Sequence, residues 1–392
     1  MRLSLILPAV QPEHYATVET CPYAGCGGRH FQHWQSVPKP LRDTQLDAVV
    51  AQRQRCLRCG RTFRVYPVGV SHDQTSARLK GVAVMCYVLG MSYGAVATAL
   101  GALGWPLSKV AIYYAVQEAG AAVAGLRRAV VARGGGRIAA LGADLTSVRC
   151  GGHWLTVGIA VDAVQGTVLS LDLLPNGEAA TLVAWVQELA AVLGAAVLVS
   201  DDADGFKTAA DESGLQHQVC KAHVGRNTAA WVEAITPLLA SDADGSLAAI
   251  AVTPEQAVAD CQELLRLVRE RQPGAPASAT LAAIHHRYLG ARKSPSGGTM
   301  TLAYRLRLFS LDRWNLWPRL THYRTWQGPA GETLDGTNNA CERALWAGWV
   351  KERSRTMRGY QRAASVRNVS RLIAAMGNAL DGPGFALAEV IA

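Results

Sequence analysis

The sequence predicts a mixed α/β protein in which an α/β sheet carries a long helical insertion and follows two smaller N-terminal regions. Short β-rich runs separated by glycine-containing turns fill residues 137–230, and a helical periodicity interrupts them. Two close cysteine pairs lie near the N-terminus, and Ala- and Leu-rich helical patterns dominate two other regions. We expect the regions of this 392-residue chain at 1–72, 73–133, 137–230, 231–335 and 336–392.

The net charge of +9 is concentrated in two stretches that lie far apart in the sequence. Between Arg53 and Lys80 seven basic residues accompany one acidic residue, and between Arg343 and Arg371 eight accompany one. Two basic clusters suit double-stranded DNA better than a small anion, although a merely soluble basic surface gives the same pattern. No apolar stretch is long enough to span a membrane. We therefore expect a cytoplasmic, nucleoid-associated protein without a membrane partner.

Paired cysteines in region 1–72 have the spacing of a zinc ribbon. Tetrahedral Zn²⁺ takes four thiolates presented by two tight knuckles, and the predicted ligands are Cys21, Cys26, Cys56 and Cys59. His30 and His33 are close enough to replace a ligand, but four cysteines need no replacement. The odd total of nine cysteines argues against a disulfide framework. Arginines around the second knuckle are predicted to contact DNA phosphates, namely Arg53, Arg55, Arg58, Arg61 and Arg64.

Region 73–133 is predicted to form three helices, at about 76–90, 91–103 and 108–128. The phrase LGMSYGAVATALG resembles the first part of a helix-turn-helix, and Ser108 is a suitable cap for the third helix. That helix would present Lys109, Tyr113, Tyr114 and Gln117 to DNA. A small helical bundle that only bridges two domains is the alternative.

Region 137–230 begins with three β-rich runs, IAALGADLT, WLTVGIAVD and GTVLSLDLL. A helical pattern over 179–193 and a fourth apolar run ending at Asp201 follow. This order matches the start of a ribonuclease-H-like sheet, in which the first and fourth strands are neighbours. Asp144 in the first run and Asp201 would then lie together. Asp202 is the main alternative to Asp201, because sequence alone does not separate adjacent carboxylates.

A third carboxylate is expected from region 336–392, after the mainly helical region 231–335. The segment TNNACERA begins a helix, with Thr337 or Asn338 as its cap and Glu342 in its opening turns. A cluster of carboxylates repels itself without cations, and Mg²⁺ relieves the repulsion through oxygen ligands. Two Mg²⁺ (or Mn²⁺) ions about 3.5–4 Å apart can activate an attacking oxygen and stabilise a leaving oxygen. Asp144, Asp201 and Glu342 are therefore the predicted catalytic metal ligands.

The segments VSDDADGF, LQHQVCKAHVGRN and DGTNNACERALWAGWVKERSRTMRGY, together with the cysteine knuckles, resemble DDE transposases of bacterial insertion sequences. The resemblance is to the Mutator-like superfamily with its Cys-x-x-His motif, and it spans most of the chain. It implies a ribonuclease-H-like core with an all-helical insertion and Mg²⁺-dependent DNA cleavage and strand transfer. The motif is Cys220 and His223, followed by Arg226 and Asn227. The pair could order the edge of the active site, touch DNA or bind metal, and the first role is favoured.

Basic and aromatic residues accompany the third carboxylate. Arg353, Arg355 and Arg358 are predicted to hold DNA phosphates, although a solvated helix face would look similar. Five tryptophans could stack on an unpaired base, but they more often anchor a core, and these are Trp314, Trp317, Trp326, Trp346 and Trp349.

The partners expected from this reading are the element's terminal inverted repeats and target DNA. Synapsis of two ends calls for a homodimer or a larger assembly. Two alternatives remain at this point: a catalytically silent, transposase-derived DNA-binding regulator, and a structure-selective nuclease with a ribonuclease-H-like fold.

Overall fold

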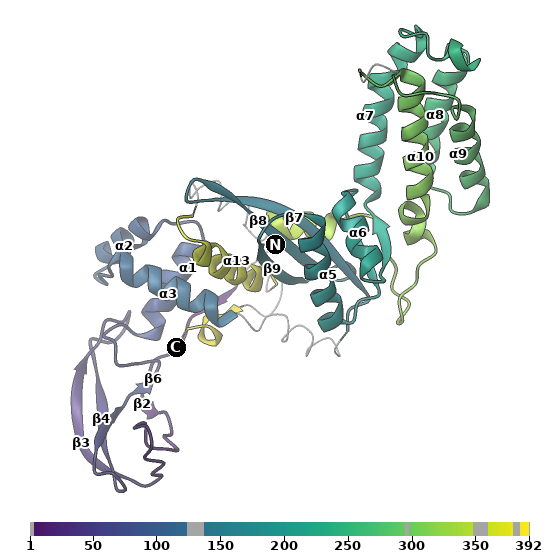
Figure 1. Ribbon diagram of the computed structural model, residues 1–392. Coiled ribbons are helices and arrows are strands. Elements are labelled where there is room, and N and C mark those ends of the chain that lie inside the picture. Colours follow the sequence, from purple (N-terminus) through teal and green to yellow (C-terminus); the bar gives the residue numbers. More distant parts are fainter. Residues whose placement is uncertain (1–3, 124–136, 295–297, 348–359, 379–384, 392) are drawn as a thin grey trace.

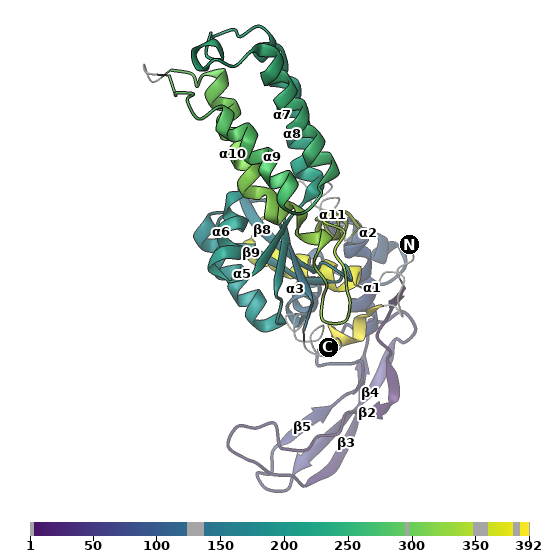
Figure 2. The ribbon, with the colours of Figure 1, turned by 90° about the vertical axis from the view of Figure 1, so that its right-hand side faces the viewer.

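The computed structural model describes residues 4–123, 137–294, 298–347, 360–378 and 385–391, with side chains up to residue 344 in the third range. The chain is elongated, with a small β module at one end and a helical bundle at the other (Figures 1 and 2). A five-stranded sheet lies between them. Within the described residues, no helix has both the length and the apolar character needed to cross a membrane.

The N-terminal β module is built on an antiparallel three-stranded sheet of β3 (Phe31–Pro40), β4 (Ala48–Cys56) and β5 (Thr62–Val65). A second pair joins β2 (Gln11–Tyr15) to β6 (Pro67–Val68), and β1 (Leu5–Ile6) pairs with β12 (Phe385–Ala386) near the C-terminus. The module's own buried apolar cluster consists of Val10, Leu41 and Val49. Three such side chains are a small core, so the module depends on additional stabilisation.

Three helices follow, α1 (Ala77–Val88), α2 (Tyr93–Ala102) and α3 (Lys109–Ala122), as the sequence predicts. Each begins after a serine, and the side-chain oxygens of Ser76, Ser92 and Ser108 each accept a hydrogen bond from a backbone amide of the first turn. The predicted end of the third helix near 128 lies outside the described residues. Repeated serine capping explains why these three helix starts are legible in the sequence.

Helix α13 (Ala363–Gly377) covers one face of α3, and this corrects part of the helix-turn-helix interpretation. Gln117 accepts a hydrogen bond from Asn368, and Tyr113 lies 3.4 Å from the hydroxyl of Ser365. Both side chains therefore face the protein, because distant residues of the chain pack there. Lys109 and Tyr114 are exposed, as expected of residues that could reach DNA.

The central sheet has the strand order β11-β10-β7-β8-β9. Its strands are β7 (Ala140–Cys150), β8 (His153–Asp162), β9 (Val168–Leu174), β10 (Val197–Ser200) and β11 (Gln216–Val219). Strands β7, β8 and β9 form an antiparallel meander, whereas β10 and β11 run parallel to β7. The sheet is therefore mixed, and β7 occupies its centre.

Helices cover both faces of the sheet. Helix α5 (Ala179–Leu193), which coincides with the predicted range 179–193, and α6 (Asp204–Glu212) cover one face. Helix α13 and the short α11 (Asn339–Ala347) lie on the other. Side chains alternate along β7, so Leu141 and Ala143 pack in the α5 cluster, whereas Val148 packs in the cluster that contains α13.

The helical bundle consists of α7 (Lys221–Ala240), α8 (Pro254–Glu270), α9 (Ala275–Arg287) and α10 (Leu302–Thr321), with short 3₁₀ turns at Ala248–Ile250 and His322–Arg324. Trp231 of α7 stacks on Phe309 of α10 with ring centroids 3.8 Å apart. Trp317 is buried in the bundle core, and Trp314 donates a hydrogen bond to Ser278. These two tryptophans therefore anchor the core. Trp326 is partly buried against another cluster, and neither Trp349 nor the side chain of Trp346 is among the described parts.

Candidate functional site

The four cysteines of the β module converge, which confirms that they could bind a metal such as zinc. Their sulfur atoms all lie within 4.8 Å of one another. The Sγ atoms of Cys21 and Cys59 are 3.8 Å apart, and those of Cys26 and Cys56 are 3.7 Å apart. A tetrahedron with Zn–S bonds of about 2.3 Å has S–S edges of roughly 3.8 Å. The sulfur arrangement therefore has the size of a four-thiolate zinc site.

Local backbone geometry explains how two knuckles present these sulfurs. Gly25, Gly27 and Gly60 adopt φ values of 75°, 59° and 71°, a region that favours glycine. A Cβ at Gly28 would lie 2.7 Å from the sulfur of Cys56, so only glycine fits at this position.

Backbone hydrogen bonds also tune the thiols. The amide of Cys59, followed by that of Arg58, lowers the pKa of Cys56 to about 7. Burial raises the pKa of Cys21 to about 12. Neither His30 nor His33 belongs to the group of converging ligand atoms. A four-cysteine site thus describes the module better than a mixed Cys/His one.

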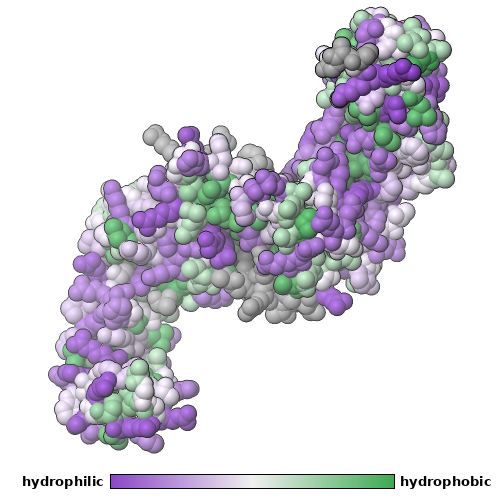
Figure 3. Space-filling model, in the orientation of Figure 1, coloured by the Kyte–Doolittle hydropathy of each residue, from purple (hydrophilic) through white to green (hydrophobic). Residues whose placement is uncertain are grey.

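The surface of the β module is mostly hydrophilic, with apolar residues between the polar ones (Figure 3). Arg55, Arg58, Arg61 and Arg64 are exposed, whereas Arg53 is half-buried and donates a hydrogen bond to Thr62. The guanidinium of Arg55 lies 5.0 Å from the ring centre of Trp34, which is itself 51% exposed. This face combines cations with an accessible aromatic ring.

The pairing of two neighbouring strands in the central sheet places Asp144 and Asp201 side by side. Strand β10 pairs with β7 through Val197 opposite Ala140 and Val199 opposite Gly142. Continuing that register by two residues sets Asp201, just past the end of β10, beside Asp144 in β7. Gly142 and Asp144 point to the same face of the sheet because side chains alternate along a strand.

Helix α11 lies on that face and carries Glu342 in its first turn. Its contact with the sheet is close, because a Cβ at Gly142 would be 3.3 Å from the sulfur of the fully buried Cys341. Just before the helix, the Nδ2 of Asn338 donates a hydrogen bond of 3.0 Å to the carbonyl oxygen of Ala143. The backbone N–H of Asn338 also donates to the sulfur of Cys220. Asn338 and Cys220 thus fasten the start of α11 beside Asp144.

The charges of Asp201 and Glu342 both act on the Asp144 carboxyl. The pKa of Asp144 is raised to about 6, first by burial and then by the negative charges of Asp201 and Glu342. The backbone amide of Leu145 and the nearby His223 oppose this rise. His223 Nε2 lies 3.7 Å from a carboxylate oxygen of Glu342, and its buried Nδ1 has no hydrogen-bond partner among the described residues.

The carboxylates are nevertheless more widely spread than the cysteines. Among the described residues, the cysteine cluster is the only set of three or more potential metal-ligand residues whose ligand atoms all lie within 4.8 Å of one another. Asp144, Asp201 and Glu342 therefore do not enclose a single small cage.

Asp201 and Asp202 have different surroundings. The Asp202 carboxylate lies 2.9 Å from Lys207 Nζ and 3.5 Å from a guanidinium nitrogen of Arg313. Asp201 instead accepts a hydrogen bond from the amide of Ala203, where the chain turns into α6, and its charge acts on Asp144. Asp202 thus faces two cations, whereas Asp201 faces the other carboxylates.

The structure shows no direct contact between the other predicted site residues it describes and the three carboxylates. Arg226 and Asn227 lie in α7 after His223 and are exposed. Arg353, Arg355 and Arg358 lie outside the described residues. Cys220 is buried at the start of α7, so it reaches the site through Asn338.

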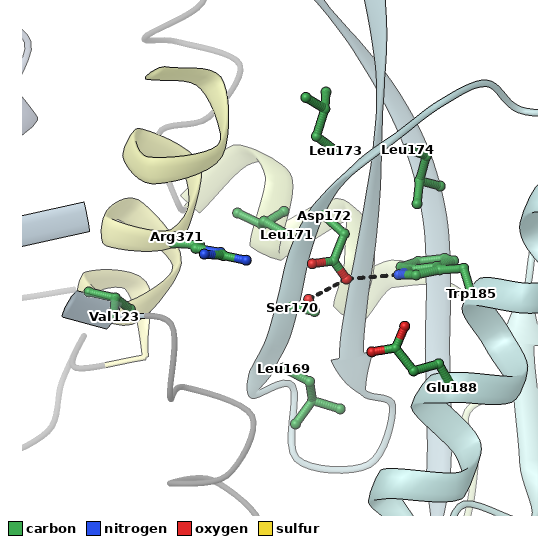
Figure 4. Close-up of a pocket in the computed structure, with 10 residues that line it drawn as sticks. All are labelled: Val123, Leu169, Ser170, Leu171, Asp172, Leu173, Leu174, Trp185, Glu188 and Arg371. Atoms are coloured by element: carbon green, nitrogen blue, oxygen red, sulfur yellow. Dashed lines mark hydrogen bonds between the residues drawn. The ribbon is translucent and has the colours of Figure 1, made fainter. Parts of the chain in front are cut away.

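A separate cavity of about 360 Å³ lies at the edge strand β9, between α5 and α13 (Figure 4). Asp172 accepts hydrogen bonds from Ser170 and from the indole of Trp185, while Arg371 approaches from α13. Strand β8 lies between β9 and β7, and the residues that line this cavity do not include Asp144, Asp201 or Glu342.

Sequence reasoning missed one group of residues next to the carboxylates, namely Ser200, His217 and Arg319. Their contacts join β10, β11 and α10. No local pattern marks them, because His217 and Arg319 are separated by 102 positions.

Comparison with known proteins identifies no family. No protein-family model matches the chain, and no curated protein is similar to it in sequence.

Proposed function

We propose that this protein is a DNA transposase of the DDE type, with a ribonuclease-H-like core that cleaves DNA at element ends and joins them to target DNA. The observation that carries the proposal is that Asp201, just past a strand that neighbours the strand of Asp144, and Glu342, on a separate helix, both act through their charges on Asp144. The order of the sheet supports it, because the first and fourth strands of the core, β7 and β10, are neighbours. The four-helix bundle before α11 is the proposed insertion.

The donor set fits hard divalent cations. The negative charges of Asp201 and Glu342 disfavour ionisation of Asp144, and Mg²⁺ or Mn²⁺, which take oxygen ligands, would supply the opposing positive charge. When bound, the ions would stabilise charge on the attacking and leaving oxygens. In this proposal Asp144, Asp201 and Glu342 hold the ions. Asp202 stays with Lys207 and Arg313.

The reaction would proceed in two in-line displacements at phosphorus. In the first, the oxygen of water attacks an end phosphodiester, the P–O3′ bond breaks, and a 3′-hydroxyl and a 5′-phosphate are released. In the second, that 3′-hydroxyl oxygen attacks a target phosphodiester, loses its proton to solvent, and displaces a new 3′-hydroxyl. The chain's own contribution is to orient the three carboxylates, with His223 beside Glu342 and Asn338 holding the start of α11.

DNA would be held by the N-terminal module with structural Zn²⁺ and by the exposed side of α3. Arg55, Arg58, Arg61 and Lys109 supply exposed cations there, and phosphate contacts of this type position a duplex without reading its sequence. The partners proposed are the terminal inverted repeats and target DNA, bound by a homodimer or larger assembly that brings two ends together.

The test uses the full-length protein and duplexes that carry the inverted repeats flanking its reading frame. We expect Mg²⁺- or Mn²⁺-dependent cleavage and strand transfer by the wild type. Asp144→Ala should bind ends with unchanged affinity and lose cleavage. The matched control is Asp204→Ala, because Asp204 is 96% exposed and forms only a surface ion pair with Lys207.

Each alternative function has its own outcome. End binding without cleavage by wild type or variant would point to a silent DNA-binding regulator and overturn the proposal. Cleavage of hybrids or branched DNA without any joining would point to a structure-selective nuclease.

A further inference from the structure

A buried hydrogen-bond chain reaches from the helical bundle to the residue next to the carboxylates. The hydroxyl of Ser200, the last residue of β10, lies 2.9 Å from His217 Nε2 in the neighbouring strand β11. The other ring nitrogen of His217 lies 2.9 Å from a guanidinium nitrogen of Arg319 in α10. Ser200 and His217 are both buried.

The chemistry of the donors fixes the direction of this chain. A guanidinium only donates hydrogen bonds, so Nδ1 of His217 must accept from Arg319 and Nε2 must carry the ring proton. His217 then donates to Ser200, whose own hydroxyl proton is directed to the carbonyl oxygen of Asp201 at 2.9 Å. Burial, and next the charge of Arg319, lower the pKa of His217 to about 3, so the ring is neutral as this arrangement requires.

Arg319 is itself fixed. Its second terminal nitrogen donates to both carboxylate oxygens of Asp211 at 2.8 and 2.7 Å, and its first also reaches the carbonyl oxygen of Lys207. Lys207 and Asp211 lie in α6, the helix that starts just after Asp201. The guanidinium is thus held through both of its terminal nitrogens, by Asp211 on one side and by His217 and Lys207 on the other. Helix α10 therefore contacts α6 directly, and it reaches β10, the strand before Asp201, through His217 of β11.

A second contact from the same helix acts on the same turn. Arg313 of α10 approaches Asp202, which also pairs with Lys207. The turn that carries Asp201 is thus held by α10 on both sides.

We propose that Arg319, His217 and Ser200 are positioning residues through which helix α10 sets the place of the Asp201 carboxylate, so that the helical bundle and the carboxylate site are coupled. The inference rests on the proposed function, because it takes Asp201 as a metal ligand. Residues that orient a ligand from behind typically change metal affinity 10- to 100-fold when they are replaced.

The experiment compares full-length wild type with His217→Leu, Ser200→Ala, Arg319→Met and Arg319→Lys. Two readouts need no catalysis: the Mn²⁺ dissociation constant from calorimetry, and amide hydrogen exchange of peptides spanning residues 198–206 in metal-free protein. We expect His217→Leu to weaken Mn²⁺ binding roughly 10- to 100-fold and to accelerate exchange. Arg319→Lys should retain more of the affinity than Arg319→Met, and added Mn²⁺ should restore end cleavage in part.

Tyr288→Phe is the control for a general loss of stability. It removes a buried hydrogen bond to Asp260 inside the bundle, at a distance from the sheet, and Asp260 keeps its contacts with Gln256 and Arg287. Its melting temperature should fall while its Mn²⁺ affinity stays at the wild-type value. Should His217→Leu fail to fold, Ser200→Ala replaces it, because it deletes one oxygen and leaves the strand intact.

The outcomes separate this inference from the proposed function. Wild-type Mn²⁺ binding that is unaffected by Asp201→Ala would overturn both. A second outcome would overturn the inference alone. In it, Mn²⁺ binding and cleavage depend on Asp201, but the variants at Ser200, His217 and Arg319 keep the wild-type Mn²⁺ affinity and the wild-type rate of amide exchange. Equal losses in Tyr288→Phe and His217→Leu would also overturn it, because the chain would then contribute only stability.

Discussion

Replacing Asp144 by asparagine should stabilise the metal-free protein at neutral pH. The pKa of this carboxyl is raised from its ordinary 3.8 to about 6, chiefly by burial. The folded protein therefore binds a proton more tightly than the unfolded chain does. The pKa difference of about 2 corresponds to about 3 kcal/mol of folding free energy, at 1.36 kcal/mol per pH unit.

The sign of the pH dependence follows from the direction of that change. Below about pH 4 the carboxyl is protonated in both the folded and the unfolded state, so wild type carries no penalty. As the pH rises through about 6, the folded protein loses the stability that it gains from holding the Asp144 proton more tightly than the unfolded chain does. Asp144→Asn stays neutral throughout, so its advantage should grow between these limits to at most about 3 kcal/mol and then remain constant.

Thermal unfolding of metal-free wild type and Asp144→Asn at a series of pH values measures this difference. For a unit of 150–250 residues, each kcal/mol moves the melting temperature by roughly 2–4 °C. Mn²⁺ at neutral pH should raise the melting temperature of wild type and not that of the variant. Asp202→Asn is the control of opposite sign, because it weakens pairs with Lys207 and Arg313. Equal melting temperatures of wild type and Asp144→Asn at pH 7 would refute the reasoning.

Three further predictions concern the metal, the packing and the DNA. A strong chelator should remove one zinc per chain and abolish DNA binding, and Cys59→Ser should purify with less zinc by elemental analysis, because the module has a small apolar core. Gly120→Ala should destabilise the protein by about 1–3 kcal/mol in denaturant titrations, since its Cβ would lie 2.3 Å from the carbonyl oxygen of Asn368; an unchanged midpoint would contradict the packing of α13 on α3. Arg55→Gln should weaken end binding for all sequences alike and reduce the salt dependence by about one counterion, as measured by fluorescence anisotropy across a salt series.

Local features of the sequence were enough for the two cysteine knuckles and for several secondary-structure elements. Two cysteines within one tight turn already share a neighbourhood, so only the meeting of Cys21 and Cys26 with Cys56 and Cys59 required the fold. The starts of α1, α2 and α3 follow from serine caps, whose hydrogen bonds span three residues. The range of α5 follows from its apolar periodicity, which is also a local property.

Only the tertiary structure separated residues that are equivalent in sequence. Asp201 and Asp202 are adjacent, yet one faces the carboxylates and the other faces Lys207 and Arg313. Tyr113 and Gln117 were expected to face DNA, but α13 covers them. Such outcomes depend on which distant segments pack together, and the periodicity of a single segment carries no information about its partner.

The sequence by itself thus determined which residues could serve as metal ligands and where the serine-capped helices and α5 begin. The tertiary structure decided which carboxylates act on Asp144 and which residues fasten the segments that carry them. Hydrogen bonds within one turn depend on neighbours along the chain, whereas the contact of His217 with Arg319 exists only after β11 and α10 have packed together.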